Sequence, residues 1–379
     1  MAKPVRRTRL LRTLTRAAKS QQSMLTRLLD VYAPAPQKPS PQKPAPQKPA
    51  PQKPAPRKPA ARRQARTGLA PATGRWLAGR FPLPAAFGQA GAQGMQYWLY
   101  VPERASEDPA RDGWPLVVML HGCHQTATQF AQGTRMNHLA EAKGYAVLYP
   151  QQLVSAQAQR CWRWYDRATQ EGGGETAVLA ALIGSVCEQH PIDRRRIYAC
   201  GLSAGAGMAA ILALNHPELV AAVAMHSGPV FGVGHSPMSA LHVMRHGAAA
   251  HADAAILGLL QRRAAAPMPP LPALLVQGED DQVVHPVNQQ QLARQWLRLN
   301  GLPAGPATRV ALKPAGRGGS RNAHAIHDYL VGRKVVLRVA RIAGLGHAWS
   351  GGDPALAFNA KAGPDASRMA LDFFSRHRR

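Results

Sequence analysis

Three residue types that together perform nucleophilic ester chemistry occur in this sequence, starting with a serine in a distinctive turn pattern. Ser203 stands in Gly-Leu-Ser-Ala-Gly (201–205), after residues of strand character (197–200) and before a run of small and apolar residues typical of a helix. A serine flanked by glycines at a strand-to-helix turn is the nucleophile-elbow pattern, whose glycines prevent collisions in a very tight turn. The pattern alone is a weak indication, because the chain contains 34 glycines. It therefore needs a base and an acid elsewhere.

A histidine and a group of carboxylates follow two later apolar segments. Residues 335–342 lead into Gly-Leu-Gly-His-Ala-Trp with His347, and residues 273–277 lead into Gly-Glu-Asp-Asp. Serine becomes nucleophilic when a histidine takes its proton, and a carboxylate holds that histidine in the required tautomer. The order serine, acid, histidine is the order expected in α/β hydrolases. On these residues alone, the candidates for the acid are Glu279, Asp280 and Asp281.

Hydrogen-bond donors for a negatively charged reaction intermediate are also predicted. Such an oxyanion requires donors placed in advance, usually backbone N–H groups. We expect one from Ala204, directly after the serine, and one from Cys123 in His-Gly-Cys, which follows an apolar strand. Gly122 permits the backbone to turn its amide groups toward a pocket.

The elements that must position these residues are short apolar strands alternating with helices. This alternation predicts a single α/β domain with a mostly parallel sheet covered on both faces. In such a sheet, catalytic groups lie on loops beyond the carboxyl ends of the strands. The predicted strands are 95–101, 116–120, 145–149, 197–200, 220–225, 273–277 and 335–342. Four helices are predicted: one that begins beyond residue 131, one over 175–189, one directly after Ser203 and one over 364–375.

Several motifs together resemble one known family. They are His-Gly-Cys (121–123), Gly-Thr-Arg-Met-Asn (133–137), Cys-Trp-Arg-Trp (161–164), Gly-Leu-Ser-Ala-Gly, the spacing of Gly278, Asp281 and Val284, and Gly-His-Ala-Trp-Ser-Gly-Gly (346–352). Over about residues 85–376 the chain resembles the catalytic domain of polyhydroxybutyrate depolymerases, a family that includes feruloyl and acetylxylan esterases. The resemblance implies an α/β-hydrolase fold without a metal or organic cofactor, and it selects Asp281 as the acid. The chain departs from the family at Gln277, where histidine is common, and at Arg163, where asparagine is common.

Other residues near these motifs allow two interpretations each. Trp162, Trp164 and Trp349 are expected to line a groove for the acyl group or polymer, the alternative being packing beneath the loops. Cys123 and Cys161 are candidates for a disulfide, although free thiols are usual in the cytoplasm. Cys187 and Cys200 are expected in the core. A loop rich in Ala, Gly and Met is predicted to cover the pocket rather than bind a metal, although it contains His235, His242, His246 and His251.

The basic charge is concentrated at the N-terminus. The chain has 47 Lys and Arg against 20 Asp and Glu, and 17 of these basic residues but one acidic residue fall within residues 1–66. Residues 1–33 are predicted to form a basic amphipathic helical segment, 34–66 a disordered Pro/Lys-rich repeat linker, and 67–379 the catalytic domain. The repeat contains no aromatic residue for base stacking, so a solubilising tether is favoured over nucleic-acid binding. Contact with an anionic surface is the further alternative for the amphipathic segment.

The cellular location and the substrate are predicted from the N-terminal segment and from the family resemblance. Arg12, Arg16 and Lys19 interrupt the place of a signal-peptide apolar region, and no apolar run approaches the ~18–20 residues of a membrane span, which favours the cytoplasm. We expect a serine esterase acting on poly(3-hydroxybutyrate) or its oligomers, similar to the intracellular members that act on amorphous granules. The alternatives are a soluble carboxylesterase for feruloyl, acetyl or other short acyl esters, and a protein that binds granules or nucleic acid through its basic tail.

Overall fold

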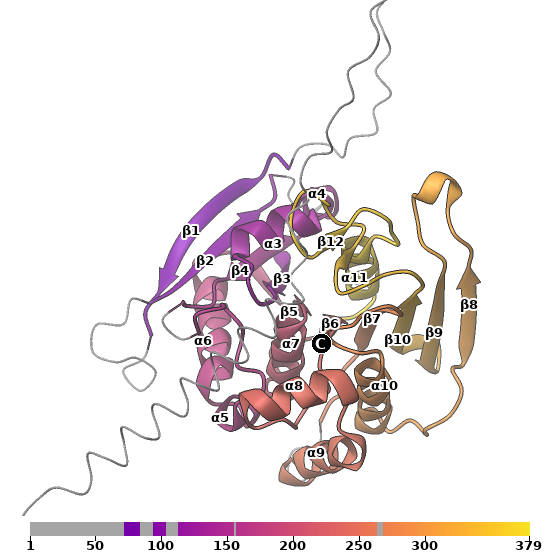
Figure 1. Ribbon diagram of the computed structural model, residues 1–379. Coiled ribbons are helices and arrows are strands. Elements are labelled where there is room, and N and C mark those ends of the chain that lie inside the picture. The colour runs from indigo at the N-terminus through magenta and orange to yellow at the C-terminus, as the bar shows by residue number, and fades with distance from the viewer. Residues whose placement is uncertain (1–71, 84–93, 104–112, 155–156, 264–267) are drawn as a thin grey trace, which may run out of the picture.

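The computed structural model describes residues 72–83, 94–103, 113–154, 157–263 and 268–379 (Figure 1). The predicted segments 1–33 and 34–66 lie outside them. Ten strands of the described residues form one sheet in the order β1-β2-β4-β3-β5-β6-β7-β10-β9-β8.

The centre of the sheet is parallel and contains six strands. They are β3 (Trp114–Leu120), β4 (Ala146–Pro150), β5 (Ile192–Leu202), β6 (Ala222–His226), β7 (Ala273–Gly278) and β10 (Lys334–Ile342). Along β3, alternate residues enter two different core clusters, because successive side chains of a strand point to opposite faces. Burial on both faces explains why these strands are nearly continuous apolar runs.

Antiparallel strands extend the sheet at both edges. They are β1 (Arg75–Phe81) and β2 (Met95–Val101) on one side and β8 (Arg309–Lys313) and β9 (His324–Val331) on the other. The predicted strands are confirmed to within about two residues, except that β5 begins five residues before the predicted 197–200. Strands β1, β8 and β9 were not predicted. A separate two-stranded pairing joins β11 (Trp349–Ser350) to β12 (Asn359–Ala360).

Helices cover both faces of the sheet. One core cluster contains residues of α6 (Gly174–Gln189), α7 (Ala204–Asn215), α8 (Pro237–His246), α9 (Ala249–Arg262) and α10 (Val287–Leu299). The opposite cluster contains residues of α3 (Ala127–Thr134), α4 (Met136–Lys143) and α11 (Ala366–Phe374). The short helices α5 (Arg167–Gln170) and η2 (Arg317–Gly319) complete the elements. The strand order, the parallel centre and the two helical layers are those of the predicted α/β-hydrolase fold.

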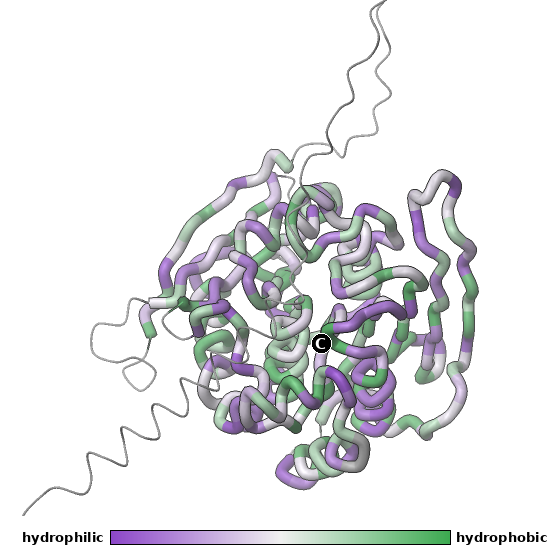
Figure 2. Tube along the Cα trace, viewed as in Figure 1, coloured by the Kyte–Doolittle hydropathy of each residue, from purple (hydrophilic) through white to green (hydrophobic). Residues whose placement is uncertain are grey.

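Two features of the helices bear on the site. Helix α7 follows Ser203 and is buried along nearly its whole length, and Figure 2 shows it in green and white whereas the partly exposed α10 carries purple. The segment with the four histidines was expected to be a loop, but most of it is helical. His242 and His246 lie in α8 and His251 lies in α9, whereas His235 precedes α8. Helix α8 begins with a Ser236 capping box and has Pro237 in its first turn. In the described part of the chain, no helix combines the length and apolar character needed to cross a membrane.

Candidate active site

Ser203 lies at a strained turn between β5 and α7. Its backbone has φ 57° and ψ −121°, a conformation that is uncommon for a residue with a side chain. The turn is held by a hydrogen bond of 2.9 Å from the Ser203 N–H to the carbonyl of His226 on the neighbouring strand. Strain held by surrounding structure is typical of a nucleophile elbow, and it presents the hydroxyl at the end of the sheet.

The two glycines of the elbow are required by close backbone contacts. A Cβ atom at Gly205 would lie 2.0 Å from the carbonyl oxygen of Leu120, and one at Gly201 would lie 2.3 Å from the backbone of Gly205. Both distances are far below any tolerated contact. Strand β3, strand β5 and helix α7 can therefore approach one another only because these positions lack side chains.

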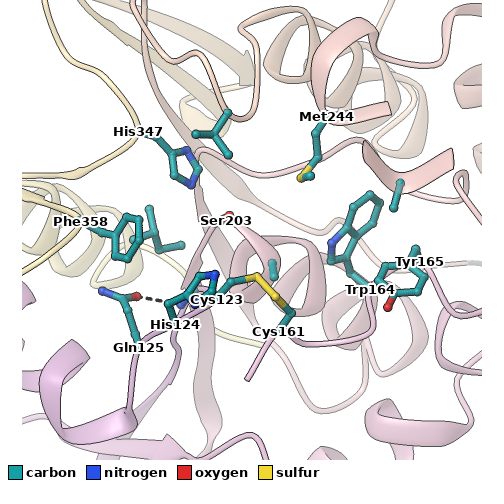
Figure 3. Close-up of a pocket in the computed structure, with 15 residues that line it drawn as sticks. Cys123, His124, Gln125, Cys161, Trp164, Tyr165, Ser203, Met244, His347 and Phe358 are labelled. Carbon is teal, nitrogen blue, oxygen red and sulfur yellow. Dashed lines mark hydrogen bonds between the residues drawn. A yellow bond between two sulfur atoms is a disulfide. The ribbon is translucent and has the colours of Figure 1, made fainter. Parts of the chain in front are cut away.

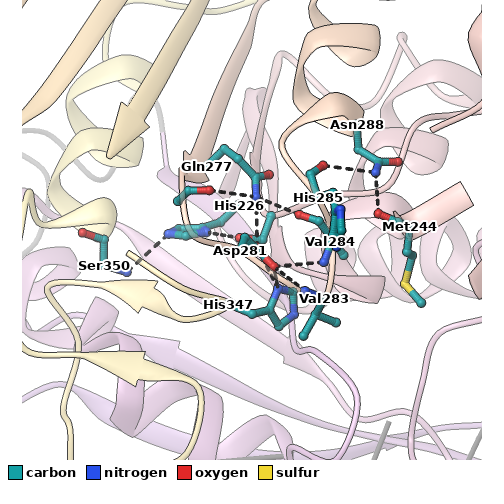
Figure 4. Close-up of polar contacts among 12 residues, drawn as sticks. His226, Met244, Gln277, Asp281, Val283, Val284, His285, Asn288, His347 and Ser350 are labelled. Carbon is teal, nitrogen blue, oxygen red and sulfur yellow. Dashed lines mark hydrogen bonds and ion pairs between the residues drawn. The ribbon is translucent and has the colours of Figure 1, made fainter. Parts of the chain in front are cut away.

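His347 and Asp281 come together from two loops that are bonded to each other. The Asp280 N–H donates to the Leu345 carbonyl at 3.1 Å, which joins the loop after β7 to the loop after β10. As a result, His347 Nδ1 lies 2.9 Å from Asp281 Oδ2 and 3.1 Å from Oδ1 (Figure 4). Glu279 and Asp280 are exposed, whereas Asp281 is 1% exposed. Of the three candidate acids, the geometry thus brings Asp281 to the histidine.

The Asp281 carboxylate is surrounded by donors. Its Oδ1 accepts from the N–H groups of Val283 (3.0 Å) and Val284 (2.9 Å), and its Oδ2 accepts from Gln277 Nε2 (3.0 Å). Burial alone would raise the pKa of Asp281, but His347 and the two backbone N–H groups lower it below its usual value. The acid is therefore ionised at neutral pH and suited to stabilise a protonated His347. The same Gln277 amide donates to the Val284 carbonyl at 2.9 Å, which fixes its orientation.

His226 connects the serine turn to the loop that carries His347. Its Nε2 accepts from the Ser350 N–H at 3.3 Å (Figure 4). Its carbonyl accepts from the Ser203 N–H, and its ring stacks on Trp349 with centroids 5.2 Å apart. Burial lowers the pKa of His226 to about 3, so the ring is neutral and can act as an acceptor. The predicted strand 220–225 ends directly before His226, and no local signal in the sequence indicated this connection.

The predicted oxyanion loop is held from behind by a second neutral histidine. His121 is buried, and burial lowers its pKa to about 4. Because its Nε2 accepts from the Gln152 N–H (3.2 Å), its Nδ1 carries the proton and donates to the Gly122 carbonyl (2.8 Å). In a trans peptide the C=O and N–H point in opposite directions, so the N–H of Cys123 points away from His121.

Ala204 supplies the first N–H of α7, where the helix dipole favours negative charge. Both Cys123 and Ala204 line the cavity beside Ser203.

The cavity at Ser203 is small and mostly apolar (Figure 3). Its volume is about 50 Å³, and by the same measure one water molecule needs ~10–15 Å³. Its apolar lining comes from α8, from the loop after β7 and from loops near β12 and α5, and includes Trp164, Ala240, Met244, Val283 and Phe358. The space suits an acyl group of a few carbon atoms.

Of the three tryptophans predicted to contact substrate, Trp164 alone lines this cavity. Trp162 is fully buried with its ring 5.6 Å from that of His121, and Trp349 packs edge-on against Phe130 at 5.5 Å. The indole N–H of Trp349 donates to Ser367. The expectation that Trp162 and Trp349 line the groove is therefore wrong, since both support the loops from within the core.

The cysteines are resolved by the structure. Cys123 and Cys161, for which the sequence left a disulfide and free thiols open, form a disulfide that joins the oxyanion loop to the loop preceding Trp164. Cys187 and Cys200 are free and buried, as predicted.

The four histidines do not form a multidentate cluster. Among the described residues no three His, Cys, Asp or Glu side chains lie close enough together to hold a metal ion. Instead, Ala240 and Met244 of α8 line the cavity, so this segment does cover the pocket as a helix.

Comparison with known proteins relates this site to ester hydrolases. The model of the family described as esterase PHB depolymerase matches residues 95–315. Poly(3-hydroxyalkanoate) depolymerase C of Paucimonas lemoignei is 30% identical over 198 residues, which cover 51% of this chain and 46% of that protein. Feruloyl esterase B of Thermothelomyces thermophilus is 30% identical over 140 residues, covering 36% and 45%. Acetylxylan esterase A of Talaromyces purpureogenus is 31% identical over 156 residues, covering 41% and 38%.

The chain thus spans less than half the length of these three relatives. Among solved structures, an acetyl xylan esterase from Aspergillus awamori superposes with a TM-score of 0.60 at 18% identity, covering 80% of this chain and 99% of that one. At this identity the likeness supports the fold.

Proposed function

Because the chain belongs to the esterase PHB depolymerase family, whose model matches more than half of its residues, we propose that it hydrolyses poly(3-hydroxybutyrate) or its oligomers through an acyl-enzyme. Membership of this family makes it an ester hydrolase. The observation that carries the substrate proposal is the cavity at Ser203, whose volume of about 50 Å³ and apolar walls fit a short hydroxyacyl group. The small space favours a short aliphatic acyl group over an aromatic feruloyl group.

In the proposed reaction, Ser203, His347 and Asp281 act as nucleophile, base and orienting acid. The Ser203 oxygen bonds to the ester carbonyl carbon while His347 takes its proton, and Asp281 stabilises the resulting imidazolium. The N–H groups of Cys123 and Ala204 hold the oxyanion. The C–O bond to the alcohol then breaks as His347 returns the proton to the leaving oxygen. A water molecule, deprotonated by His347, then attacks the acyl carbon. The bond from this carbon to the Ser203 oxygen breaks as His347 returns the proton to that oxygen, which releases the acid and restores the serine.

A second candidate is an esterase for acetyl or other short acyl groups on soluble substrates. The same small cavity favours it, because an acetyl group also fits. The two candidates differ in whether a polymer chain can reach Ser203 past α8.

The experiment measures the rate at which the protein hydrolyses each of four substrates: amorphous poly(3-hydroxybutyrate) granules, acetylated xylan, ethyl ferulate and p-nitrophenyl butyrate. We expect turnover of granules and of the butyrate ester, and little turnover of ferulate. Turnover of acetylated xylan without granule hydrolysis would select the second candidate. Near-normal rates for Ser203→Ala or His347→Ala on p-nitrophenyl butyrate would contradict the assigned triad.

The N-terminal region and the location form a separate part of the proposal. The sequence favours the cytoplasm and the granule surface, whereas the Cys123–Cys161 bridge is typical of oxidising compartments. Fractionation of the source cells, with thiol labelling before and after reduction, decides between these two locations.

We propose that residues 1–66 dock the enzyme on granules or another anionic surface. Deleting them should then reduce granule hydrolysis and leave p-nitrophenyl butyrate turnover intact, whereas unchanged granule hydrolysis would remove the docking role.

A further inference from the structure

A second hollow lies at the end of the sheet opposite to Ser203. It is formed where the parallel strands begin, by residues that start or precede β5, β6, β7 and β10, together with the segment after α11. Its volume is about 910 Å³. Because the triad follows the carboxyl ends of the same strands, a ligand in this groove would not compete with an ester substrate at Ser203.

The walls of this groove carry a large excess of positive charge. Its cationic side chains are Arg195, Arg196, Lys334, Arg376, Arg378 and Arg379, and its acidic side chains are Asp193 and Glu218. Asp193 is already engaged, with Arg196 Nε at 2.5 Å and Arg195 Nε at 3.6 Å. Lys334, Arg376 and Arg378 are exposed and form no ion pair with another described residue. Of the two acidic side chains, only Glu218 remains to offset them, so the groove keeps a net positive charge.

The groove is built by ordered contacts rather than by a loose chain end. The Arg379 N–H donates to the Arg195 carbonyl at 3.0 Å, and the Tyr198 hydroxyl donates to the His377 carbonyl at 2.7 Å. These bonds fix the segment after α11 against the start of β5. The cations of that segment are consequently held along one wall before any ligand arrives, which reduces the entropy cost of binding.

His377 places a buried polar atom in the wall of this groove. It lines the groove, is 8% exposed, and its Nε2 has no hydrogen-bond partner among the described residues. Burial, and then the charges of Lys334 and Arg376, lower its pKa to about 4. The nearby cations that disfavour a proton on this ring would favour a negative charge at the same place. The unpartnered ring nitrogen therefore lies where an anion would be stabilised.

The arrangement points to the chemical class of the ligand. The four cationic side chains that are not paired with Asp193 still exceed what a single carboxylate requires. The guanidinium fork matches phosphate oxygens in two parallel hydrogen bonds. The remaining lining is mostly proline, valine and alanine, without a Phe, Tyr or Trp ring for nucleobase stacking. A flat membrane would reach only the rim of a concave site. We propose that this groove binds a compact oligophosphate anion.

The test is calorimetric titration of the full chain with tripolyphosphate. The groove variant Lys334→Gln/Arg376→Gln/Arg378→Gln is compared with Arg75→Gln/Arg294→Gln/Arg317→Gln, which removes the same charge from exposed positions outside the groove. We expect at least a tenfold loss of affinity in the groove variant and less than a twofold loss in the control. Retained p-nitrophenyl butyrate turnover in both variants shows that they are folded.

Two results would overturn the proposal. Equal losses in the two variants would assign tripolyphosphate binding to general charge, including that of residues 1–66. Groove-dependent binding of a single-stranded oligonucleotide, with no groove-dependent binding of tripolyphosphate, would assign the surface to nucleic acid instead. Neither result depends on the proposed ester substrate.

Discussion

Replacing His226 by phenylalanine tests whether a neutral histidine holds the catalytic loops together. Phenylalanine preserves a ring that can stack on Trp349 but has no acceptor for the Ser350 N–H, which lies 3.3 Å from His226 Nε2. Ser350 is fully buried, so its N–H would lose its partner without gaining water. An unsatisfied buried donor costs ~1–3 kcal/mol, which is the expected loss in the free energy of unfolding at pH 7.

The difference between wild type and His226→Phe should shrink in acid. The pKa of His226 is about 3 in the folded state because of burial, below the ~6.5 of an unfolded histidine. A group whose folded pKa is lowered contributes stability above the unfolded pKa and loses it as pH falls, since the unfolded chain takes up the proton first. Wild type therefore loses ~1.4 kcal/mol per pH unit below ~6.5 through this residue, or roughly 2 kcal/mol at pH 5. Phenylalanine has no such loss.

The assay is urea unfolding at pH 7 and pH 5, combined with steady-state kinetics on p-nitrophenyl butyrate. We expect kcat to fall by roughly 10- to 100-fold with little change in KM, because small displacements of a catalytic group have effects of this size. His216→Phe, at a partly exposed site away from the triad, serves as the control. A stability difference that stays constant between the two pH values would refute the neutral, buried role of His226. Unchanged kcat would refute its link to the His347 loop.

Three further predictions concern the elbow, the edge of the sheet and the disulfide. Gly205→Ala should abolish folding or activity, because its Cβ would lie 2.0 Å from the Leu120 carbonyl oxygen, whereas Gly184→Ala, with no atom within 4 Å, should stabilise α6 by ~0.5–1 kcal/mol in thermal unfolding. Asp328→Asn should cost roughly 1.5–3 kcal/mol at pH 7, because the buried carboxylate accepts from Arg338 at 2.6 and 2.9 Å. Burial would raise the pKa of Asp328 but Arg338 and Arg309 lower it, so this contribution is lost as pH falls through that lowered pKa, and urea unfolding of the variant should lack that acid-dependent loss. Cys123→Ser/Cys161→Ser should lose ~2–4 kcal/mol of stability and part of kcat, whereas the free, buried Cys187→Ser should leave kcat unchanged; equal kcat in the two would show that the bridge does not support the oxyanion loop.

The triad could be predicted from sequence because of a property of parallel sheets. Ser203, Asp281 and His347 each follow an apolar strand, and the carboxyl ends of such strands meet at one edge. Which of the three acidic residues faces His347 could not be derived from spacing alone, because neighbouring residues of a loop point in different directions. The choice depends on burial and on the bond from Asp280 to Leu345.

Other parts of the site depend on contacts between distant segments. Trp162 and Trp349 stand in motifs beside the triad, yet a motif does not determine whether a ring points into the cavity or the core. The role of His226 arises from one carbonyl and one ring nitrogen that meet segments far apart in sequence. Strands β1 and β8 were missed because they are exposed and rich in arginine and lysine, and so lack the apolar run of the buried strands.

The crowding at Gly205 has a consequence for redesign of this protein. The elbow tolerates no added atom, but the side chains that shape the acyl space, such as Ala240, Met244 and Phe358, come from a helix and a loop outside the sheet. Reactivity and selectivity therefore reside in separately mutable parts of the chain. A library confined to those three positions could change the preferred acyl length while the turn that activates the serine stays untouched.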